Sequence, residues 1–411
     1  MPIQGLGTIY FNQDETALAA ENMQKAYELR AHVSENERLH IEMSYEFAVT
    51  RNFEAARKSA LALSQIYPRD FSTYANLAVA YGYLGDYEKA LAASQKAQEL
   101  NPGVLQVYTN LIYDYMHLNR LSDAEAVAAD ARKRNLDSPF VHELLYLVEF
   151  LKRDTAAVER EKSKSDSNLL AYFESDTAAY GGQFAKARGL TEQAAGKALR
   201  AGQKETAAEY RAEGAVREAL VGNAALAKRQ ARDALGLSTG KGVALSAITL
   251  GLGGDPEASR LAEDLGKRFP EDTALNYNLL PTARAATALH NGEPAKAIAA
   301  LAVSSPYELG ATLQTANFWL YSVYLRGEAY LAAKQGAAAA VEFRKIVDHP
   351  GLVVNEPIGA LAHLGLGRAY VLSHDEAKAK AEYQNFLTLW KDADPDIPIL
   401  KEAKTEYAKL Q

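Results

Sequence analysis

The stretch NLAVAYGYLGDYEKAL, residues 76–91, decides the fold. Large side chains stand three or four residues apart before a turn at Gly85, and small residues such as Ala90 and Ala97 follow it. Large residues at that spacing form an apolar stripe on one helix, and alanines allow a second helix to approach that stripe closely. Pro102 then ends the second helix. The stretch therefore predicts a pair of antiparallel helices.

The same pattern recurs at a shift of 34 residues on both sides of this pair. Three consecutive matches at one period are the signature of a repeat protein. The equivalent positions are His40, Met43, Ser44, Phe47, Ala56, Ala60 and Pro68 upstream, and Tyr108, Leu111, Ile112, Tyr115, Ala124, Ala128 and Ala131 downstream.

The rest of the chain keeps the pattern in weaker form. Two further units near the C-terminus are separated by 40 residues, because the connection DHPGLVVNEP (348–357) between them is longer. Between 139 and 315 each unit retains a glycine turn followed by an alanine. The units are marked by Gly327, Tyr330, Ala339 and Phe343, by Gly367, Tyr370, Ala379 and Tyr383, and in the middle by Gly182, Gly222, Gly253 and Gly292.

These residues resemble the tetratricopeptide repeat family, whose consensus is close to residues 76–91. The resemblance implies an all-α, right-handed superhelical solenoid. Counting the turns predicts about eleven antiparallel helix pairs, the first of them truncated. A final helix from about Pro398 to Leu410 has one narrow apolar stripe and is expected to cap the end.

The regularity of the repeat predicts three regions. Residues 1–138 form a regular array, 139–315 form divergent helix pairs, and 316–411 hold two repeats and the capping helix. The main break in the pattern is EREKSKSDSN (159–168), where charges and serines replace the apolar stripe. We expect an exposed loop there, with a hinge as one possible use of it.

Composition excludes several classes of protein. A formal net charge of −7 does not suit a nucleic-acid binder, which needs a basic surface to neutralise phosphates. With no cysteine, the chain has no disulfide and no thiolate metal site. The longest apolar cluster, 318–325, is too short to span a bilayer, and the N-terminus has no leader pattern. We expect a cytoplasmic protein or the soluble extracytoplasmic part of a membrane-anchored parent.

Several segments resemble a narrower group, the C-terminal repeat region of bacterial eukaryotic-like Ser/Thr protein kinases of the acidobacterial type. The segments are 269–298, 305–310 (SPYELG), 324–332 (YLRGEAYLA) and 389–411. In that family a kinase domain, commonly followed by a membrane span, precedes the repeats. The resemblance covers only the repeat half, since the chain has no glycine-rich phosphate loop, no His-Arg-Asp catalytic loop and no Asp-Phe-Gly triplet.

Candidate chemical motifs fail on spacing. GLSTGKG (236–242) has three residues between its first two glycines where a phosphate-binding loop needs four, and Gly242 follows the lysine where Ser or Thr is required. The eight histidines never fall four residues apart with an acidic companion, so the sequence predicts no metal site. We expect no cofactor and no catalytic residue.

The family resemblance also places residues on a concave groove, through defined positions of the first helix of each pair. Aromatic residues there are good anchors for a peptide, because they bury a large area with few rotors. The family's peptide-carboxylate clamp is not matched, and packing without a ligand stays an equal alternative. The expected groove residues are Tyr45, Tyr83, Thr109, Tyr113, His117, Tyr321, Tyr324, Glu328 and Arg368.

The sequence thus predicts a non-catalytic scaffold that binds a protein or peptide in this groove, as a regulatory or sensor region related to Ser/Thr kinases. One alternative is the detached C-terminal part of a kinase whose catalytic domain lies outside the chain. A second is a small-molecule sensor, although residues 170–320 show no convergent polar cluster in the sequence. The oligomeric state is left open.

Overall fold

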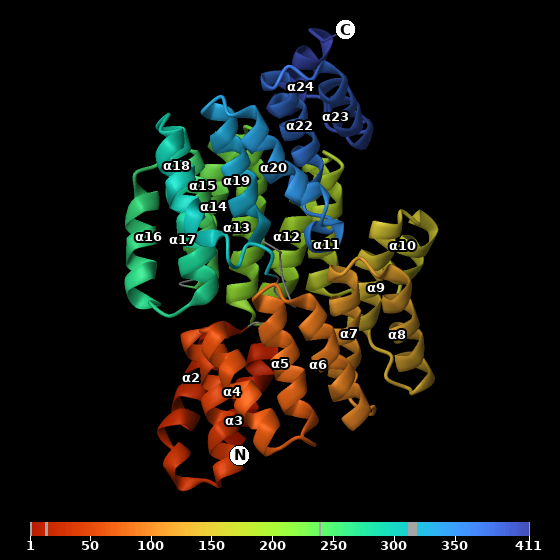
Figure 1. The fold of residues 1–411 in the computed structure, drawn as a ribbon, viewed down its shortest axis with the longest axis vertical. Helices are drawn as coiled ribbons and strands as arrows, with labels where there is room; N and C mark the ends of the chain where they lie inside the picture. The colour runs from red at the N-terminus through yellow and green to blue at the C-terminus, as the bar shows by residue number, and fades with distance from the viewer. Residues whose placement is uncertain (1, 13–14, 238–239, 311–318, 411) are drawn as a thin grey trace. The chain divides into compact units, whose positions relative to one another are not determined.

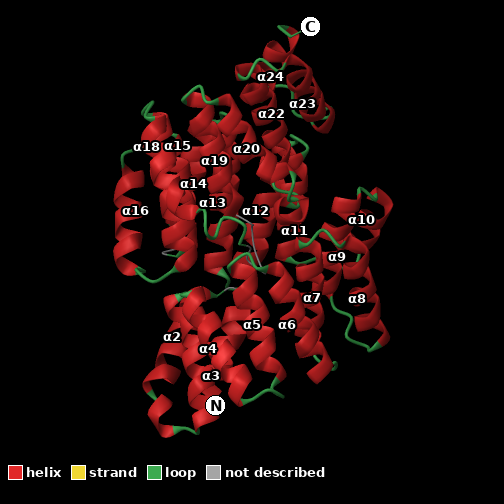
Figure 2. Ribbon diagram, viewed as in Figure 1, coloured by secondary structure: helices red, strands yellow, loops and turns green. Residues whose placement is uncertain are grey.

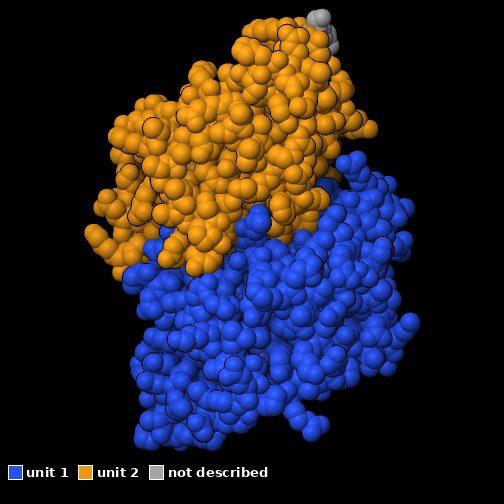
Figure 3. Space-filling view, viewed as in Figure 1, with its two compact units in different colours: residues 1–165, 269–276, 309–315 blue, residues 166–268, 277–308, 316–411 orange. Residues whose placement is uncertain are grey.

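The computed structural model describes residues 2–12, 15–237, 240–310 and 319–410, and all regular structure in these ranges is helical (Figure 1 and Figure 2). The chain divides into two compact units, coloured separately in Figure 3. Unit 1 comprises residues 1–165, 269–276 and 309–315, and unit 2 comprises residues 166–268, 277–308 and 316–411.

Unit 1 is built from five consecutive helix pairs. A π-helical segment, η2, continues α3. The helices are α1 (Pro2–Asn12), α2 (Thr16–Glu28), η1 (Arg30–His32), α3 (Glu35–Tyr45), η2 (Glu46–Thr50), α4 (Phe53–Ile66), α5 (Phe71–Tyr83), α6 (Tyr87–Leu100), α7 (Leu105–His117), α8 (Leu121–Lys133), α9 (Pro139–Lys152) and α10 (Thr155–Lys162).

Unit 2 contains the remaining helices, among them a single short helix, α21, and a terminal one, α24. They are α11 (Asn168–Tyr180), α12 (Phe184–Arg200), α13 (Lys204–Leu220), α14 (Ala224–Leu235), α15 (Lys241–Leu252), α16 (Glu257–Arg268), η3 (Leu275–Leu279, which begins in the 269–276 segment of unit 1), α17 (Leu280–His290), α18 (Pro294–Leu301), η4 (Ala302–Ser304), α19 (Trp319–Ala332), α20 (Gly336–Val347), α21 (Pro350–Val353), α22 (Pro357–Leu372), α23 (Glu376–Leu389) and α24 (Pro398–Ala408).

A left-handed residue closes the turn within most pairs. Gly85, between α5 and α6, has φ +82°, a backbone conformation that costs a residue with a side chain energy. The amide of Asp86 then donates to the carbonyl of Tyr81 and satisfies one orphan carbonyl at the end of α5. Glycine is thus the residue that allows two helices to turn back with a very short connection.

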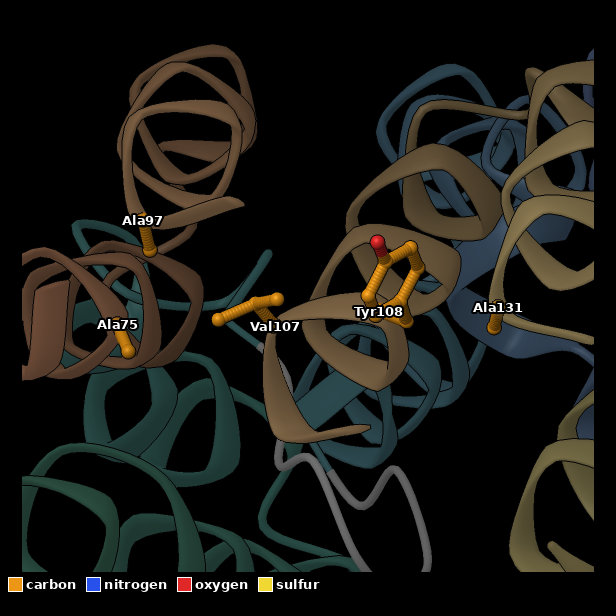
Figure 4. Close-up of a cluster of buried hydrophobic side chains, with 5 residues drawn as sticks. All are labelled: Ala75, Ala97, Val107, Tyr108 and Ala131. Atoms are coloured by element: carbon orange, nitrogen blue, oxygen red, sulfur yellow. The ribbon is translucent and has the colours of Figure 1, made fainter. Parts of the chain in front are cut away.

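A buried cluster of unit 1 combines three alanines with Val107 and the ring of Tyr108; Val107 lies on the side of Ala75 and Ala97, and Tyr108 on the side of Ala131 (Figure 4). Tyr108 on α7 is fully buried, and its hydroxyl donates to the carbonyl of Pro102 at 3.0 Å. Small residues such as Ala97 on α6 and Ala131 on α8 allow the second helices to pack closely against α7. The cluster consists of Ala75, Ala97, Val107, Tyr108 and Ala131.

In unit 2 the last helices pack against the first. α22 contacts α11, as Figure 1 shows. The indole Nε1 of Trp390 donates to the carbonyl of Tyr180 at 2.9 Å, and the amide of Ile399 donates to the carbonyl of Val221 at 3.4 Å. The unit is therefore closed by contacts between its two ends.

The fold class predicted from the sequence is confirmed. The described residues contain eleven consecutive helix pairs, α1/α2 to α19/α20 and α22/α23, and then α24, close to the predicted capping helix. α24 also packs against the turn at Gly222 through Pro398, so it covers more than the end of one helix pair.

One local expectation is corrected, and the structure adds detail to two others. The loop predicted at 159–168 is shorter, because α10 continues to Lys162 and α11 begins at Asn168. The connection 348–357 contains α21 and is largely buried. In the pair Gly253-Gly254, the left-handed residue is Gly254. Residues 238–239 of the predicted turn at 236–242 lie outside the described residues.

Candidate partner-binding site

The groove residues expected in unit 1 lie at the ends of α3 and α5 and along α7. Tyr45, the last residue of α3, is half-buried and stacks on Tyr27 with ring centroids 4.0 Å apart. Tyr83, the last residue of α5, is buried and stacks on Phe53 at 3.9 Å. Each ring is therefore held by a neighbouring ring, so that its position is set before any ligand arrives.

On α7, the expected residues form a buried aromatic and polar group. Tyr113 lies 5.8 Å from the ring of His117, which in turn lies 4.9 Å from Tyr87 on α6. Thr109, also buried, donates its hydroxyl to the carbonyl of Gln106. The structure thus brings Thr109, Tyr113 and His117 onto one helix beside Tyr87, a residue that the sequence did not single out.

Burial controls the charge of this group. It lowers the pKa of His117 to about 3, so the ring is neutral at physiological pH, and its buried Nδ1 has no hydrogen-bond partner. Burial raises the pKa of Asp114 to about 8, against the opposing effect of a 2.5 Å hydrogen bond from the Ser94 hydroxyl. Both side chains are therefore held in their uncharged forms at pH 7.

A segment from later in the chain lies on the same unit beside these residues. The Tyr87 hydroxyl donates to the main-chain carbonyl of Leu309, and a Cβ at Gly85 would be 3.2 Å from the Leu309 carbonyl carbon. Glycine allows this close main-chain approach without a shift of the Leu309 backbone. The turn between α5 and α6 therefore already accommodates a stretch of peptide backbone.

A second segment, 269–276, lies against the end of η2 and the start of α4. The amide of Thr273 donates to the carbonyl of Arg51, and its hydroxyl accepts from the amide of Phe53. Arg51 forms a salt bridge of 2.8 Å with Asp272. This segment is therefore held by one contact between main-chain atoms and two that use side chains, whereas Leu309 is held through its main-chain carbonyl.

The expected groove residues of unit 2 are engaged in contacts inside that unit. Tyr321 and Tyr324 are 1% and 3% exposed, and the Tyr321 hydroxyl donates to Glu356 at 2.8 Å. Arg368 on α22 binds both carboxylate oxygens of Glu406 on α24, at 2.9 and 3.0 Å.

The carboxyl of Glu328 interacts with Tyr324 and Arg368. Burial raises the pKa of Glu328, and the nearby Arg368 guanidinium lowers it. Tyr324, Glu328 and Arg368 thus form one group that joins α19, α22 and α24. No aromatic row comparable to that of unit 1 emerges from these positions.

Unit 2 also contains a buried polar cluster that the sequence did not reveal. It overturns the expectation that residues 170–320 lack convergent polar groups. Its members are Tyr172 and Asp176 on α11, Glu213 and Arg217 on α13, Tyr321 on α19, and Glu356 just before α22.

Part of this cluster has a signal in the sequence. Glu356 precedes Pro357 in a connection longer than the repeat requires. Asp176, Glu213 and Arg217 instead look like ordinary charges of helices, because nothing near them in sequence shows that they meet.

An open cavity of 410 Å³ lies among α1, α3 and the start of α5. Its polar groups are already engaged: His40 contacts Asp70 at 2.8 Å, Asp70 also caps α5 through Ser72, and Glu37 forms a capping box with Ser34. The remaining lining residues are Gln4 and Asn36. We assign no ligand to this cavity.

Among the described helices, none is long and apolar enough to cross a membrane. The nearest approach to a metal-binding arrangement in the described residues is the cluster of Asp176, Glu213 and Glu356.

Comparison with known proteins adds one family and a set of weak structural similarities. No curated protein matches the chain in sequence. The similar solved structures include the APC/C hetero-tetramer Cut9–Hcn1 (14% identity, 98% of this chain, 74% of that chain, TM-score 0.49). Yeast Tom70 is 12% identical, with 100% of this chain and 95% of that chain covered and a TM-score of 0.38. A tetratricopeptide repeat protein from Parabacteroides merdae ATCC 43184 is 17% identical, with 81% of this chain and 98% of that chain covered and a TM-score of 0.29. At these identities and TM-scores the similarities say nothing about partners. The tetratricopeptide repeat family matches residues 71–104, the pair α5/α6 with its exit, so the repeat first inferred from the sequence is confirmed at this position.

Proposed function

We propose that the chain is a non-catalytic scaffold that binds a protein or peptide on unit 1, at a surface formed by Tyr45, Tyr83, Thr109, Tyr113 and His117 together with Tyr87. The observation that carries the proposal is the hydrogen bond from the Tyr87 hydroxyl to the main-chain carbonyl of Leu309. A surface that holds one stretch of backbone in this way has the geometry to hold another.

The chemistry of the surface favours a peptide over a charged small molecule. Its side chains are mainly aromatic, and His117 and the adjacent Asp114 are both neutral at pH 7. Aromatic rings provide contact area, and the Tyr87 hydroxyl provides a hydrogen bond that any main-chain carbonyl can accept. Binding would depend on apolar side chains and backbone rather than on charge.

The proposal extends to the relation with kinases. The segments quoted above, from 269–298 to 389–411, support a regulatory or sensor region related to bacterial Ser/Thr kinases. The scaffold would then present a partner to a kinase domain or report the presence of that partner. Sequencing the genomic region upstream tests this relation directly, because a kinase domain encoded in the same reading frame or operon supports it and an unrelated gene contradicts it.

The test of the binding surface is selection of peptides from a displayed library against the full chain. The affinity of a selected peptide is then measured by fluorescence anisotropy for the wild type and for Tyr83→Ala/Tyr113→Ala/His117→Ala. We expect the triple variant to lose at least about tenfold in affinity, as truncation of aromatic anchors does at other interfaces. Circular dichroism establishes that both proteins are equally helical.

Two matched variants separate binding from packing. Tyr115→Ala changes a residue of the same helix that contacts Gln95 and Arg120 instead of this group, and it should leave affinity unchanged. Tyr87→Phe removes only the hydroxyl and should change affinity with little change in folding. The proposal is wrong if the selected peptides bind wild type and triple variant equally well.

A further inference from the structure

The carboxyl groups of Asp176, Glu213 and Glu356 converge in the interior of unit 2. Each offers an oxygen atom, and the three atoms lie within 4.8 Å of one another. All three residues are at most 3% exposed. They come from α11, from α13 and from the turn before α22, so they join the beginning of unit 2 to a segment near its end.

Among the printed contacts of the described residues, this cluster joins three carboxyl groups to one guanidinium. Arg217 is the cation in direct contact, and its guanidinium donates to Asp176 and also to the hydroxyls of Ser175 and Thr191. Glu209, one turn earlier on α13, adds further negative potential at Glu213. An uncompensated buried carboxylate costs several kcal/mol, so this cluster must take up either a proton or a further cation.

The orientation of the carboxylates points to where that charge belongs. The hydroxyl of Tyr172 donates to Oε2 of Glu213, that of Tyr321 donates to Oε2 of Glu356, and Arg217 donates to Oδ1 of Asp176. Groups that hold one oxygen of each ligand are the usual outer layer of a metal site, because they fix the direction of the other oxygen.

An independent observation is that Oε1 of Glu213 is buried and has no hydrogen-bond partner. A buried carboxylate oxygen without a donor is rare in folded proteins, since nothing replaces the water that it loses. It is the atom that a cation placed among the three carboxylates would contact.

We propose that Asp176, Glu213 and Glu356 bind one hard divalent cation of the Ca²⁺, Mg²⁺ or Mn²⁺ class. The donor set is made only of carboxylate oxygens, without histidine or cysteine, and such sets favour these ions. Ligand oxygens at about 2.1 to 2.5 Å from an ion lie about 3 to 5 Å from one another, in agreement with the spacing here. A divalent ion, the guanidinium of Arg217 and the three carboxylates together are neutral.

The cation would connect α11 and α13 to the residues that lead into α22. Because the same contact region is closed by Trp390 and Ile399, the ion would strengthen the closed form of unit 2. This site lies entirely within unit 2 and does not depend on the peptide surface proposed for unit 1.

The experiment uses Tb³⁺, which replaces Ca²⁺ in oxygen sites and emits when a nearby tyrosine is excited. Tyr172 and Tyr321 both donate to ligands of the proposed site, so the full chain, freed of metal with EDTA, should sensitise one Tb³⁺ per molecule. Ca²⁺ or Mn²⁺ should displace the Tb³⁺ and should raise the melting temperature of the metal-free chain. Glu213→Gln should weaken Tb³⁺ binding at least about tenfold, because it removes one anionic ligand.

The controls distinguish a metal from a proton. Glu263→Gln changes an exposed carboxylate of α16 and should bind Tb³⁺ like the wild type. Glu356→Gln repeats the test from a different segment, in case Glu213→Gln does not fold. The proposal is overturned if the folded wild type shows neither sensitised emission nor a metal-dependent melting temperature, since Glu213 and Glu356 then share a proton instead.

Discussion

The interiors of the two units solve the same packing problem with different residues. In unit 1, the cluster around Tyr108 is apolar apart from one hydroxyl, and alanines set the distance between helices. In unit 2, Arg217 is almost completely buried and is surrounded by carboxylates and hydroxyls. The difference teaches that a repeat can lose its sequence pattern and keep its helix pairs, provided that each buried polar group finds a partner.

This contrast predicts the largest loss of stability at Arg217. Arg217→Met leaves Asp176 buried without its cation, and we expect a cost of about 4 kcal/mol, as for other broken buried ion pairs. Urea unfolding followed by circular dichroism measures it. Arg260→Met, at an exposed pair with Glu257, should change stability by less than about 0.5 kcal/mol. Equal midpoints for the two variants would mean that the Arg217 network contributes nothing.

The apolar interior should respond to volume instead of charge. Tyr108→Ala removes a buried ring and is expected to cost about 3 kcal/mol in the same urea experiment. Tyr108→Phe removes only the hydrogen bond to Pro102 and should cost about 1 kcal/mol. If the two substitutions cost the same, the hydroxyl rather than the packing dominates, and the contrast between the units fails.

The buried carboxyl of Asp114, next to the binding surface of unit 1, predicts a pH effect. Burial raises the pKa of Asp114 to about 8, so the folded chain keeps a proton that the unfolded chain releases near pH 4. The stability that this proton contributes is present below about pH 4 and is lost as the pH rises through about 8. Asp114→Asn does not titrate, so its melting temperature should gain on that of the wild type as the pH rises.

The pH dependence of stability due to Asp114 can be separated from that due to His117, because the two groups act over different pH ranges. Burial lowers the pKa of His117 to about 3, and its contribution is instead lost as the pH falls from about 6.5 through 3. Measurements between pH 6.5 and 8 therefore report Asp114 alone among these two. We expect a change of at least about 1.4 kcal/mol, the equivalent of one pKa unit, and parallel pH profiles for wild type and variant would contradict the burial of a neutral carboxyl.

The smallest predicted effect compares two glycine turns, one in each unit. Gly85 and Gly202 have nearly equal φ, +82° and +83°, but only at Gly85 would a methyl group meet backbone, that of Leu309. Gly202→Ala should cost about 1 kcal/mol from the left-handed conformation alone. Gly85→Ala should cost about 1 kcal/mol more, and equal losses in thermal unfolding would show that the segment at Leu309 does not rest on this turn.

The local part of the structure could be predicted from the sequence. The spacing of large and small residues around Gly85 predicts the pair α5/α6, because helix periodicity and turn chemistry act over a few residues. It also places Tyr83, Tyr113 and His117 on the first helices of two consecutive pairs, α5 and α7. The role of these residues in binding stays a prediction.

The contacts between distant segments could not be predicted. No local rule indicates that Glu356 meets Glu213, or that Leu309 accepts a hydrogen bond from Tyr87, since the partners are far apart in the chain and no periodicity relates them. The expected groove residue Tyr321 illustrates this limit. Its position in the repeat follows from the pattern, but its burial follows from the turn before α22, which the repeat does not contain.

The closure of unit 2 has a consequence during synthesis. Trp390 is made 210 residues after Tyr180, the residue whose carbonyl it binds. At about 5 to 20 residues per second, α11 leaves the ribosome roughly 10 to 40 seconds before its last packing partner exists. Over that interval the nascent chain carries an incomplete unit 2, with the apolar and polar groups around Tyr180 uncovered. Completion of the unit therefore depends on the synthesis of Trp390, and on what shields the growing chain until then.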